Sequence, residues 1–258
     1  MTGIQTNFKR TEIKYLLNQT QYEAFTERLE KIARIDAYGK TQILNIYFDT
    51  PDFQLIRTSL EKPVYKEKLR LRTYGTPKED TNAFVEIKKK FRGVVYKRRI
   101  VLPYAEAFDY MTEGKRGKGL QECDSQIVGE IDAFMEQYHN PEGKMMISYD
   151  RIAWEGIYDP ALRITFDTNI CWRTGKLDLK YGGHGRPLLK EGEHLIEIKI
   201  TGAMDMEIAR ILSELSVFPT SFSKYGAGYK NMVNMAVARQ VAFERAAAHA
   251  MKGVTAYA

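Results

Sequence analysis

The sequence is poor in cysteine and has no long apolar run. Its 258 residues include only Cys123 and Cys171, without C-x-x-C spacing. This excludes a disulfide scaffold and a thiolate metal site, and it fits a reducing compartment. No segment approaches about 18 consecutive apolar residues, and the N-terminus lacks an apolar core followed by a cleavage site. We therefore expect a soluble, cytoplasmic protein without a transmembrane segment.

Motifs of several common enzyme classes are also missing. The chain has no G-x-x-x-x-G-K-[ST], no H-E-x-x-H and no G-x-S-x-G. A P-loop nucleotidase, a zinc protease of the H-E-x-x-H type and an α/β-hydrolase are therefore not indicated. The four histidines show no metal-ligand spacing, so we expect surface or packing roles for them.

The charge balance is only mildly positive. Lys and Arg number 39 against 33 Asp and Glu, a net charge of +6, in a chain that is 44% hydrophobic and 28% charged. These values are typical of a globular protein, and so small an excess matters through its placement. With no interdomain linker or repeat in view, we expect one domain over residues 1–258, of which 231–258 form a C-terminal helical tail.

Alternating apolar and polar residues predict eight β-strands. They are Phe8–Leu17, Gln42–Asp49, Val64–Tyr74, Asn82–Lys90, Val94–Leu102, Met145–Trp154, Leu162–Trp172 and His194–Thr201. Helical spacing predicts one helix capped by Thr20 that carries Tyr22, Phe25, Leu29 and Ile32, and others over Asp124–Tyr138, Ile208–Leu215 and Met235–Ala250. The combination indicates an α+β protein built on one mostly antiparallel sheet or barrel.

One of these strands carries a row of cations. Every second residue of "VYKEKLRLRTYG" from Lys66 to Arg72 is a cation: Lys66, Lys68, Arg70 and Arg72. Residues at alternate positions of a strand, here said to share one parity, point their side chains to the same face. Like charges side by side are destabilising, which makes an all-cationic solvent face unusual. The pattern raises the question of what such a face contacts.

The other strands repeat the pattern, with apolar residues on the opposite parity. The charged or polar sets are Arg10, Glu12 and Lys14; Asn45, Tyr47 and Asp49; Glu86, Lys88 and Lys90; Lys97 and Arg99; Tyr149 and Arg151; Arg163, Thr165 and Asp167; and Glu197 and Lys199. If helices cover the apolar faces and the sheet closes, these sets line the lumen of an eight-stranded antiparallel β-barrel. So cationic a lumen must be hydrated and filled by anions. An open sheet with one solvated face is the alternative.

The lining favours phosphate chains over nucleic acid. Base-stacking sites interleave cations with exposed aromatics, whereas this parity carries few aromatics besides Tyr47 and Tyr149. Arg and Lys suit phosphoryl oxygens. Glu12, Glu86 and Glu197 lie on the same parity and suit a Mg²⁺ or Mn²⁺ held jointly with phosphates, or they form ion pairs that reduce repulsion.

The sequence resembles a known family through several motifs in order. "RTEIKYLL", "YFDT", "KEKLRLRTYG", "VEIKKKFRGVVYKRR", "SYDR", "LIEIKI" and "SFSKYGAGY" together resemble the VTC domain, the polyphosphate polymerase branch of the triphosphate tunnel metalloenzymes, which include CYTH domains. The resemblance covers residues 8 to 230 and implies an eight-stranded antiparallel tunnel. It also implies transfer of the ATP γ-phosphate to a growing polyphosphate chain with Mn²⁺ or a similar ion.

The resemblance also implies site residues. The family's basic tunnel positions fall on Lys14, Arg70, Arg72, Lys88, Lys97, Arg151, Arg163, Lys199 and Lys224, its metal-binding glutamate on Glu197, and a Ser-Lys step on Ser223 and Lys224. Arg10, Lys68, Arg99 and Tyr47 join the substrate-binding set through their parity, and Glu12 and Glu86 join the metal set. The expected catalytic residues are Arg70, Arg72 and Lys88, which clamp the donor phosphates.

Two departures from the family pattern bear on function. Ser221 stands where the family's polymerase has a lysine, which changes the substrate end of the tunnel. The hydrolytic members of the triphosphate tunnel metalloenzymes, which this chain resembles, carry an E-x-E-x-K motif on the first strand, whereas this chain has Arg10-x-Glu12-x-Lys14. A cation in place of one carboxylate removes a metal ligand and favours holding a polyanionic product.

The expected function is therefore a metal-dependent polyphosphate polymerase, with ATP and phosphate or polyphosphate as partners. A metal-dependent tri- or polyphosphatase of the same fold is the first alternative. A module that binds polyphosphate without turnover is the second. The Ala-rich C-terminal helix, with Arg239, Glu244 and Arg245, either packs on its own domain or docks a protein or membrane partner.

Overall fold

The computed structural model describes residues 10–254, and the side chains of residues 11–122 and 124–245. Ten strands form one sheet in the order β10-β1-β9-β7-β6-β2-β3-β4-β5, with β8 paired to β7. They are β1 Arg10–Leu17, β2 Ala33–Asp49, β3 Tyr65–Tyr74, β4 Asn82–Phe91, β5 Val94–Pro103, β6 Glu142–Gly156, β7 Arg163–Arg173, β8 Arg186–Pro187, β9 His194–Thr201 and β10 Pro219–Thr220. All pairings are antiparallel, so the predicted α+β antiparallel fold is confirmed.

The helices are α1 Gln19–Leu29, α2 Gln54–Leu60, α3 Tyr104–Glu113, α4 Ser125–Gln137, α5 Met206–Glu214 and α6 Lys224–Val254, with short 3₁₀ turns at Glu122–Asp124 and Leu179–Tyr181. The prediction of Thr20 as the first N-cap was wrong. Asn18 caps α1 in extended backbone: its Oδ1 accepts a hydrogen bond from the Gln21 amide at 2.8 Å, and its own amide donates to Gln21 Oε1 at 3.1 Å. This capping box satisfies two amides at once, and α1 ends at Leu29, before Ile32.

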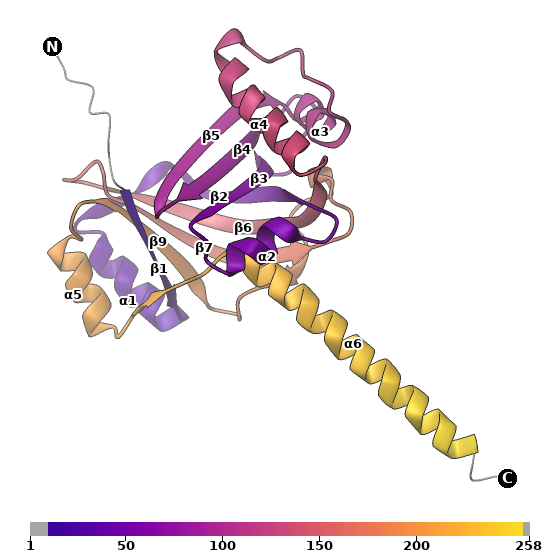
Figure 1. The fold of residues 1–258 in the computed structure, drawn as a ribbon. Coiled ribbons are helices and arrows are strands. Elements are labelled where there is room, and N and C mark those ends of the chain that lie inside the picture. Colours follow the sequence, from indigo (N-terminus) through magenta and orange to yellow (C-terminus); the bar gives the residue numbers. More distant parts are fainter. Residues whose placement is uncertain (1–9, 255–258) are drawn as a thin grey trace.

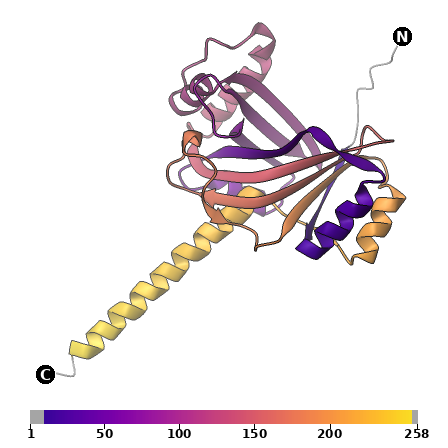
Figure 2. The same ribbon diagram turned by 180° about the vertical axis from the view of Figure 1, so that it is seen from behind.

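The sheet is strongly curved, but its hydrogen-bonded path does not return on itself (Figures 1 and 2). Within residues 10–254, no backbone pairing joins β5 to β1 or β10. We call this gap the seam, and the segment before α6 links β1 to β3 through side-chain hydrogen bonds. Lys14 Nζ on β1 donates to the carbonyl of Phe222 at 3.1 Å, and Lys68 Nζ on β3 donates to Ser223 Oγ at 3.1 Å. The curved sheet therefore encloses its concave face, here called the lumen, as far as this seam.

Two apolar clusters cover the outer face, as the strand patterns predict. One cluster joins β2 to β5 with α3 and α4, and the other joins β1, β7 and β9 with α1 and α5. Figure 1 shows these two helix pairs at opposite ends of the sheet. Because each strand gives its apolar parity to these helices, the charged parity faces the lumen.

A third apolar cluster lies inside the lumen, which the patterns did not predict. Met145 and Ile147 of β6, Trp172 of β7 and Leu195 of β9 pack there with Tyr225 of α6, and Ile56 of α2 joins them. Helices were expected only on the outer face. Here α2 and the first turns of α6 fill one end of the lumen because the inner parity of these strands is itself apolar.

The rest of α6 projects away from the sheet (Figures 1 and 2). Residues 236–245 are exposed along its length, so this part of the helix does not pack on the body of the chain. The helix also begins earlier than predicted, at Lys224. Over the described residues, no helix is long and apolar enough to cross a membrane.

Candidate functional site

A buried carboxylate organises the first of two charged clusters in the lumen. Glu86 of β4 is 1% exposed, and its Oε2 accepts Arg70 Nε at 2.7 Å and Arg70 Nη2 at 2.6 Å. Lys97 of β5 lies 2.6 Å from Oε1. Strand register helps to form this cluster, because Arg70 lies opposite Glu86 on β3 and Lys97 of β5 lies opposite Lys88, the next inward residue of β4. We call Glu86, Arg70, Arg72 and Lys97 the Glu86 cluster.

Polar residues on β2 and β6 orient the two arginines of this cluster. Arg70 donates to the Tyr47 hydroxyl at 3.0 Å. Arg72 donates to Asn45 Oδ1 at 2.8 Å and to the Tyr149 hydroxyl at 3.2 Å. Both guanidinium groups are thus fixed by neighbours on two sides, which leaves them preorganised for an anion in the lumen.

The cluster shifts the pKa of several members. Burial opposes ionisation of Glu86, but Arg70, Arg72 and Lys97 outweigh it and lower the pKa of Glu86 to about 2. Burial lowers the pKa of Lys97 to about 8, against the attraction of Glu86. Burial would raise the pKa of Tyr47, yet Arg70, Lys68 and Arg72 lower it to about 8. The site therefore favours negative charge on its acidic groups.

Acid is expected to destabilise the fold through Glu86. A carboxyl whose folded pKa lies below its unfolded value stabilises the fold above the unfolded pKa, and that stability is lost as pH falls through the folded pKa. With a folded-state pKa of about 2 against the usual 4.5, ionised Glu86 contributes about 3 kcal/mol to the free energy of unfolding. Urea unfolding between pH 5 and pH 2 should show Glu86→Gln losing less stability than wild type, and Glu142→Gln, an exposed control, losing as much as wild type.

Two carboxylates organise the second cluster. Asp167 of β7 is fully buried and binds Arg151 of β6 through two hydrogen bonds of 2.6 and 2.7 Å. Lys224, the first residue of α6, lies 2.5 Å from Asp167 Oδ2 and 3.2 Å from Glu197 Oε1. Lys14 lies 3.2 Å from the same Glu197 oxygen. We call this the Asp167–Glu197 cluster.

The charged neighbours in the second cluster favour the ionised forms of Asp167, Glu197 and Lys224. Burial would raise the pKa of Glu197, but Lys224, Lys14 and Arg151 hold it well below its usual value. Burial likewise opposes ionisation of Asp167, and Lys224 and Arg151 lower its pKa. Burial would lower the pKa of Lys224, but the two carboxylates raise it. Two cations of this cluster also lie over the Tyr149 ring: Lys224 Nζ is 4.6 Å and the Arg151 guanidinium carbon 5.2 Å from the ring centroid.

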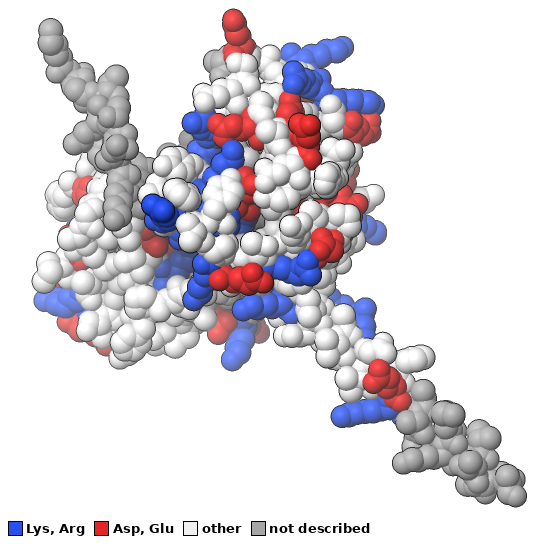
Figure 3. All heavy atoms as spheres, in the orientation of Figure 1, with Lys and Arg blue, Asp and Glu red and all other residues white. Residues whose placement is uncertain are grey.

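Several inner cations have no carboxylate within 4 Å in the part of the chain that the structure describes. They are Lys66, Lys68, Lys88, Lys90, Arg99 and Lys199. The pKa of Lys68 is lowered to about 8, chiefly by burial and also by Lys88, Lys66 and Lys14, against the attraction of Tyr47. Figure 3 shows Lys and Arg side chains gathered in the recess beside β3–β5. The lumen is thus built with more positive charge than its carboxylates balance.

Among the predicted site residues whose side chains the structure describes, Arg163 lies apart from both clusters. Arg163 lies at the rim, where it pairs with Asp36 at 3.3 Å and Glu155 at 3.8 Å rather than with either cluster. The Arg10 side chain lies outside the described residues. Ser223 lies at the seam, where its Oγ accepts from Lys68 and from the Gly226 amide.

The three glutamates predicted as metal ligands do not converge. Glu86 belongs to the first cluster, whereas Glu12 and Glu197 both contact Lys14, at 3.4 and 3.2 Å. Over the described residues, no group of three or more acidic, His or Cys side chains is arranged to hold a metal. Of the three, Glu12 and Glu197 share a contact, through the Lys14 ammonium group, and carboxylate oxygens of this kind are ligands that a divalent ion prefers.

Asp167, Asn45 and Tyr149 were predicted to face the lumen but not to be site residues. Their roles depend on partners that lie on other strands. Asp49 was also predicted to face the lumen. It is instead buried at the start of α2, where it accepts from the amides of Leu55 and Ile56 and from the Tyr225 hydroxyl.

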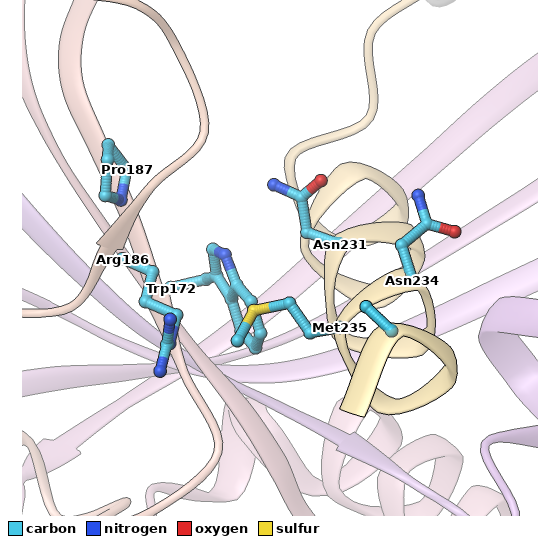
Figure 4. Close-up of a pocket in the computed structure, with 7 residues that line it drawn as sticks. Trp172, Arg186, Pro187, Asn231, Asn234 and Met235 are labelled. Carbon is cyan, nitrogen blue, oxygen red and sulfur yellow. The ribbon is translucent and has the colours of Figure 1, made fainter. Parts of the chain in front are cut away.

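Two cavities lie away from these clusters. Figure 4 shows one of about 400 Å³ between α6 and β7–β8, where Trp172 and Met235 face each other beside Arg186 and Asn231. The other, of about 780 Å³, lies along α3, α4 and the start of β6. Neither cavity is lined by a member of either charged cluster.

The chain belongs to the VTC domain family, whose model matches residues 9–233. None of the curated proteins matches it. Among solved structures it is similar to a candidate adenylate cyclase from Bacillus halodurans, with TM-score 0.50, 16% identity, and 82% of this chain and 92% of that chain covered.

A second similar structure is a candidate adenylyl cyclase from Hippeastrum, described as having a dominant triphosphatase activity. The TM-score is 0.51 at 14% identity, covering 85% of this chain and 95% of that chain. At these identities the likeness shows the fold alone. Together with the family, it identifies the fold as that of the triphosphate tunnel proteins.

Proposed function

We propose that the chain is a metal-dependent polyphosphate polymerase that transfers the terminal phosphate of ATP to phosphate or polyphosphate. The observation that carries the proposal is the presence of two cationic clusters in one lumen. Transfer between phosphates brings two anions together, which requires positive charge around both, whereas hydrolysis pairs one anion with neutral water. The Glu86 and Asp167–Glu197 clusters suit a donor and an acceptor, and membership of the VTC domain family supports this assignment.

In this mechanism the chain's residues position and stabilise rather than react covalently. Arg70, Arg72 and Lys88 hold the donor phosphates and stabilise the charge that spreads over the phosphoryl oxygens in the transition state. Arg151, Lys224 and Lys14 hold the acceptor, whose terminal oxygen is already anionic and needs no general base. The bond from the γ-phosphorus to the bridging oxygen breaks, a bond to the acceptor oxygen forms, and ADP leaves. A divalent ion on Glu197 and Glu12 would neutralise further phosphoryl charge.

The test is an incubation of the purified chain with ATP and Mn²⁺, following polyphosphate on a gel together with ADP and free phosphate. Chains that lengthen as ADP accumulates, and that stop forming when a chelator is added, are expected. Free phosphate without chains, released faster from tripolyphosphate than from ATP, would replace the proposal with the triphosphatase.

The triphosphatase remains the second candidate because the Hippeastrum structure of the same fold is described with that activity. The third interpretation, a binding module without turnover, would show tight polyphosphate binding that a chelator does not change. In each case the lumen is the binding site for a phosphate chain. The three interpretations differ in whether the phosphate is transferred to phosphate, to water, or not at all.

A further inference from the structure

The inner cations without carboxylate partners are not scattered through the lumen. Four of them form two cross-strand pairs, with Lys68 opposite Lys88 and Lys66 opposite Lys90 on β3 and β4. They continue the row that starts at Arg70 and run toward the turn between β4 and β5. Alternate residues in a strand are about 7 Å apart, so the row extends about 13 Å beyond Arg70. We call these four residues the lysine track.

Two members of the lysine track, Lys66 and Lys68, are held by neutral oxygens. Lys66 Nζ donates to the carbonyl of Ser59, in the last turn of α2, at 3.1 Å, and Lys68 donates to Ser223. Burial lowers the pKa of Lys66, and Lys90, Lys88 and Lys62 lower it further. Like charges gathered in this way are unfavourable unless an anion lies among them.

The neighbouring part of the same lumen end is closed to a phosphate chain. Met145, Ile147, Trp172 and Leu195 fill it with the start of α6. The packing is close, since a Cβ on Gly228 of α6 would lie 2.5 Å from the Met145 sulfur. This apolar cluster offers no charged groups to a highly charged chain. At this end of the lumen, a phosphate chain therefore meets charged groups along the lysine track, on the inner faces of β3 and β4.

We propose that the lysine track is an extended binding site for the distal part of a long polyphosphate chain, leading from the Glu86 cluster to the β4–β5 turn. Of its members, Lys66 and Lys90 contact phosphate units that a triphosphate is too short to reach. This proposal takes from the proposed function only that the ligand is a phosphate chain. It therefore holds for a polymerase and for a polyphosphatase.

The test compares two ligands, inorganic tripolyphosphate and long-chain polyphosphate, by titration calorimetry on the full chain without ATP. In the double variant Lys66→Ala/Lys90→Ala, affinity for the long chain is expected to fall about tenfold or more, and affinity for tripolyphosphate to change less than twofold. The salt dependence of long-chain binding should also weaken, since fewer counterions are released. Lys90→Ala alone, at an exposed position, serves if the double variant does not fold.

The matched control is Lys78→Ala/Lys89→Ala. Lys78 is exposed in the turn at the far end of β3 and β4, and Lys89 lies on β4 facing outward, 3.3 Å from Glu130. This control removes the same net charge outside the lumen and should leave both affinities within twofold. Equal losses for both ligands in the Lys66/Lys90 variant, or no loss for the long chain, would overturn the lysine track. If chains are never synthesised but binding remains length-dependent, the polymerase assignment fails and the track stands.

Discussion

Replacing Lys88 by alanine is expected to lower turnover of a triphosphate substrate about 100-fold or more. Lys88 lies on the inner face of β4 between Lys68 and Lys97 in register, with no carboxylate within 4 Å among the described residues. Its charge is therefore free to act on the donor phosphates. Removing one preorganised group that stabilises transition-state charge costs about 10² to 10³ in rate. The measurement is the initial rate of ADP or phosphate release at saturating substrate.

The neighbouring residue provides the control. Lys89→Ala removes the same charge from the same strand, but its side chain faces outward to Glu130, so turnover should change less than twofold. Lys88 is exposed, so its variant should keep the wild-type melting temperature. Similar rates for the two variants would mean that the face of the strand does not matter, which contradicts a donor site in the lumen. The comparison holds for a polymerase and for a hydrolase.

The strands were predictable because one rule governs nearly all of them. Each strand packs one set of alternate residues against helices and points the other set into the lumen. The alternation of apolar and polar residues therefore predicted all eight principal strands and placed the residues of both clusters on the lumen-facing side. The segment "KEKLRLR" shows this clearly, since Leu69 and Leu71 are fully buried in the outer core while Lys68 and Arg70 face the lumen. Local pattern and tertiary structure agree there.

The apolar cluster inside the lumen was not predictable from that rule. On β6, Met145, Met146 and Ile147 are all fully buried, because one parity packs in the outer core and the other meets α6. A strand buried on both faces loses its alternation. The helix α2 was also missed, since its N-cap residue Phe53 makes no side-chain cap hydrogen bond and its amides are satisfied by Asp49 instead. Such contacts depend on the folded chain rather than on local sequence.

Replacing Asp167 by asparagine is expected to lower the free energy of unfolding by about 3–5 kcal/mol, because breaking a buried ion pair leaves uncompensated charge. Asp167 is fully buried and lies between Arg151 and Lys224. Its loss leaves Glu197 alone to balance both cations and Lys14. Since Lys224 begins α6, the start of that helix should also loosen. Urea unfolding at neutral pH measures the effect.

Asp150→Asn is the matched control, because Asp150 lies on β6 next to Arg151 and pairs with the exposed Lys40 at 3.1 Å. A surface pair of this kind contributes about 0–1 kcal/mol. The double variant Asp167→Asn/Lys224→Met removes one carboxylate and one cation together, so it should recover part of the lost stability. A coupling energy above about 1 kcal/mol in this cycle would establish the pair. If Asp167→Asn costs no more than Asp150→Asn, the cations of the second cluster do not depend on Asp167, and Glu197 alone must hold them in place.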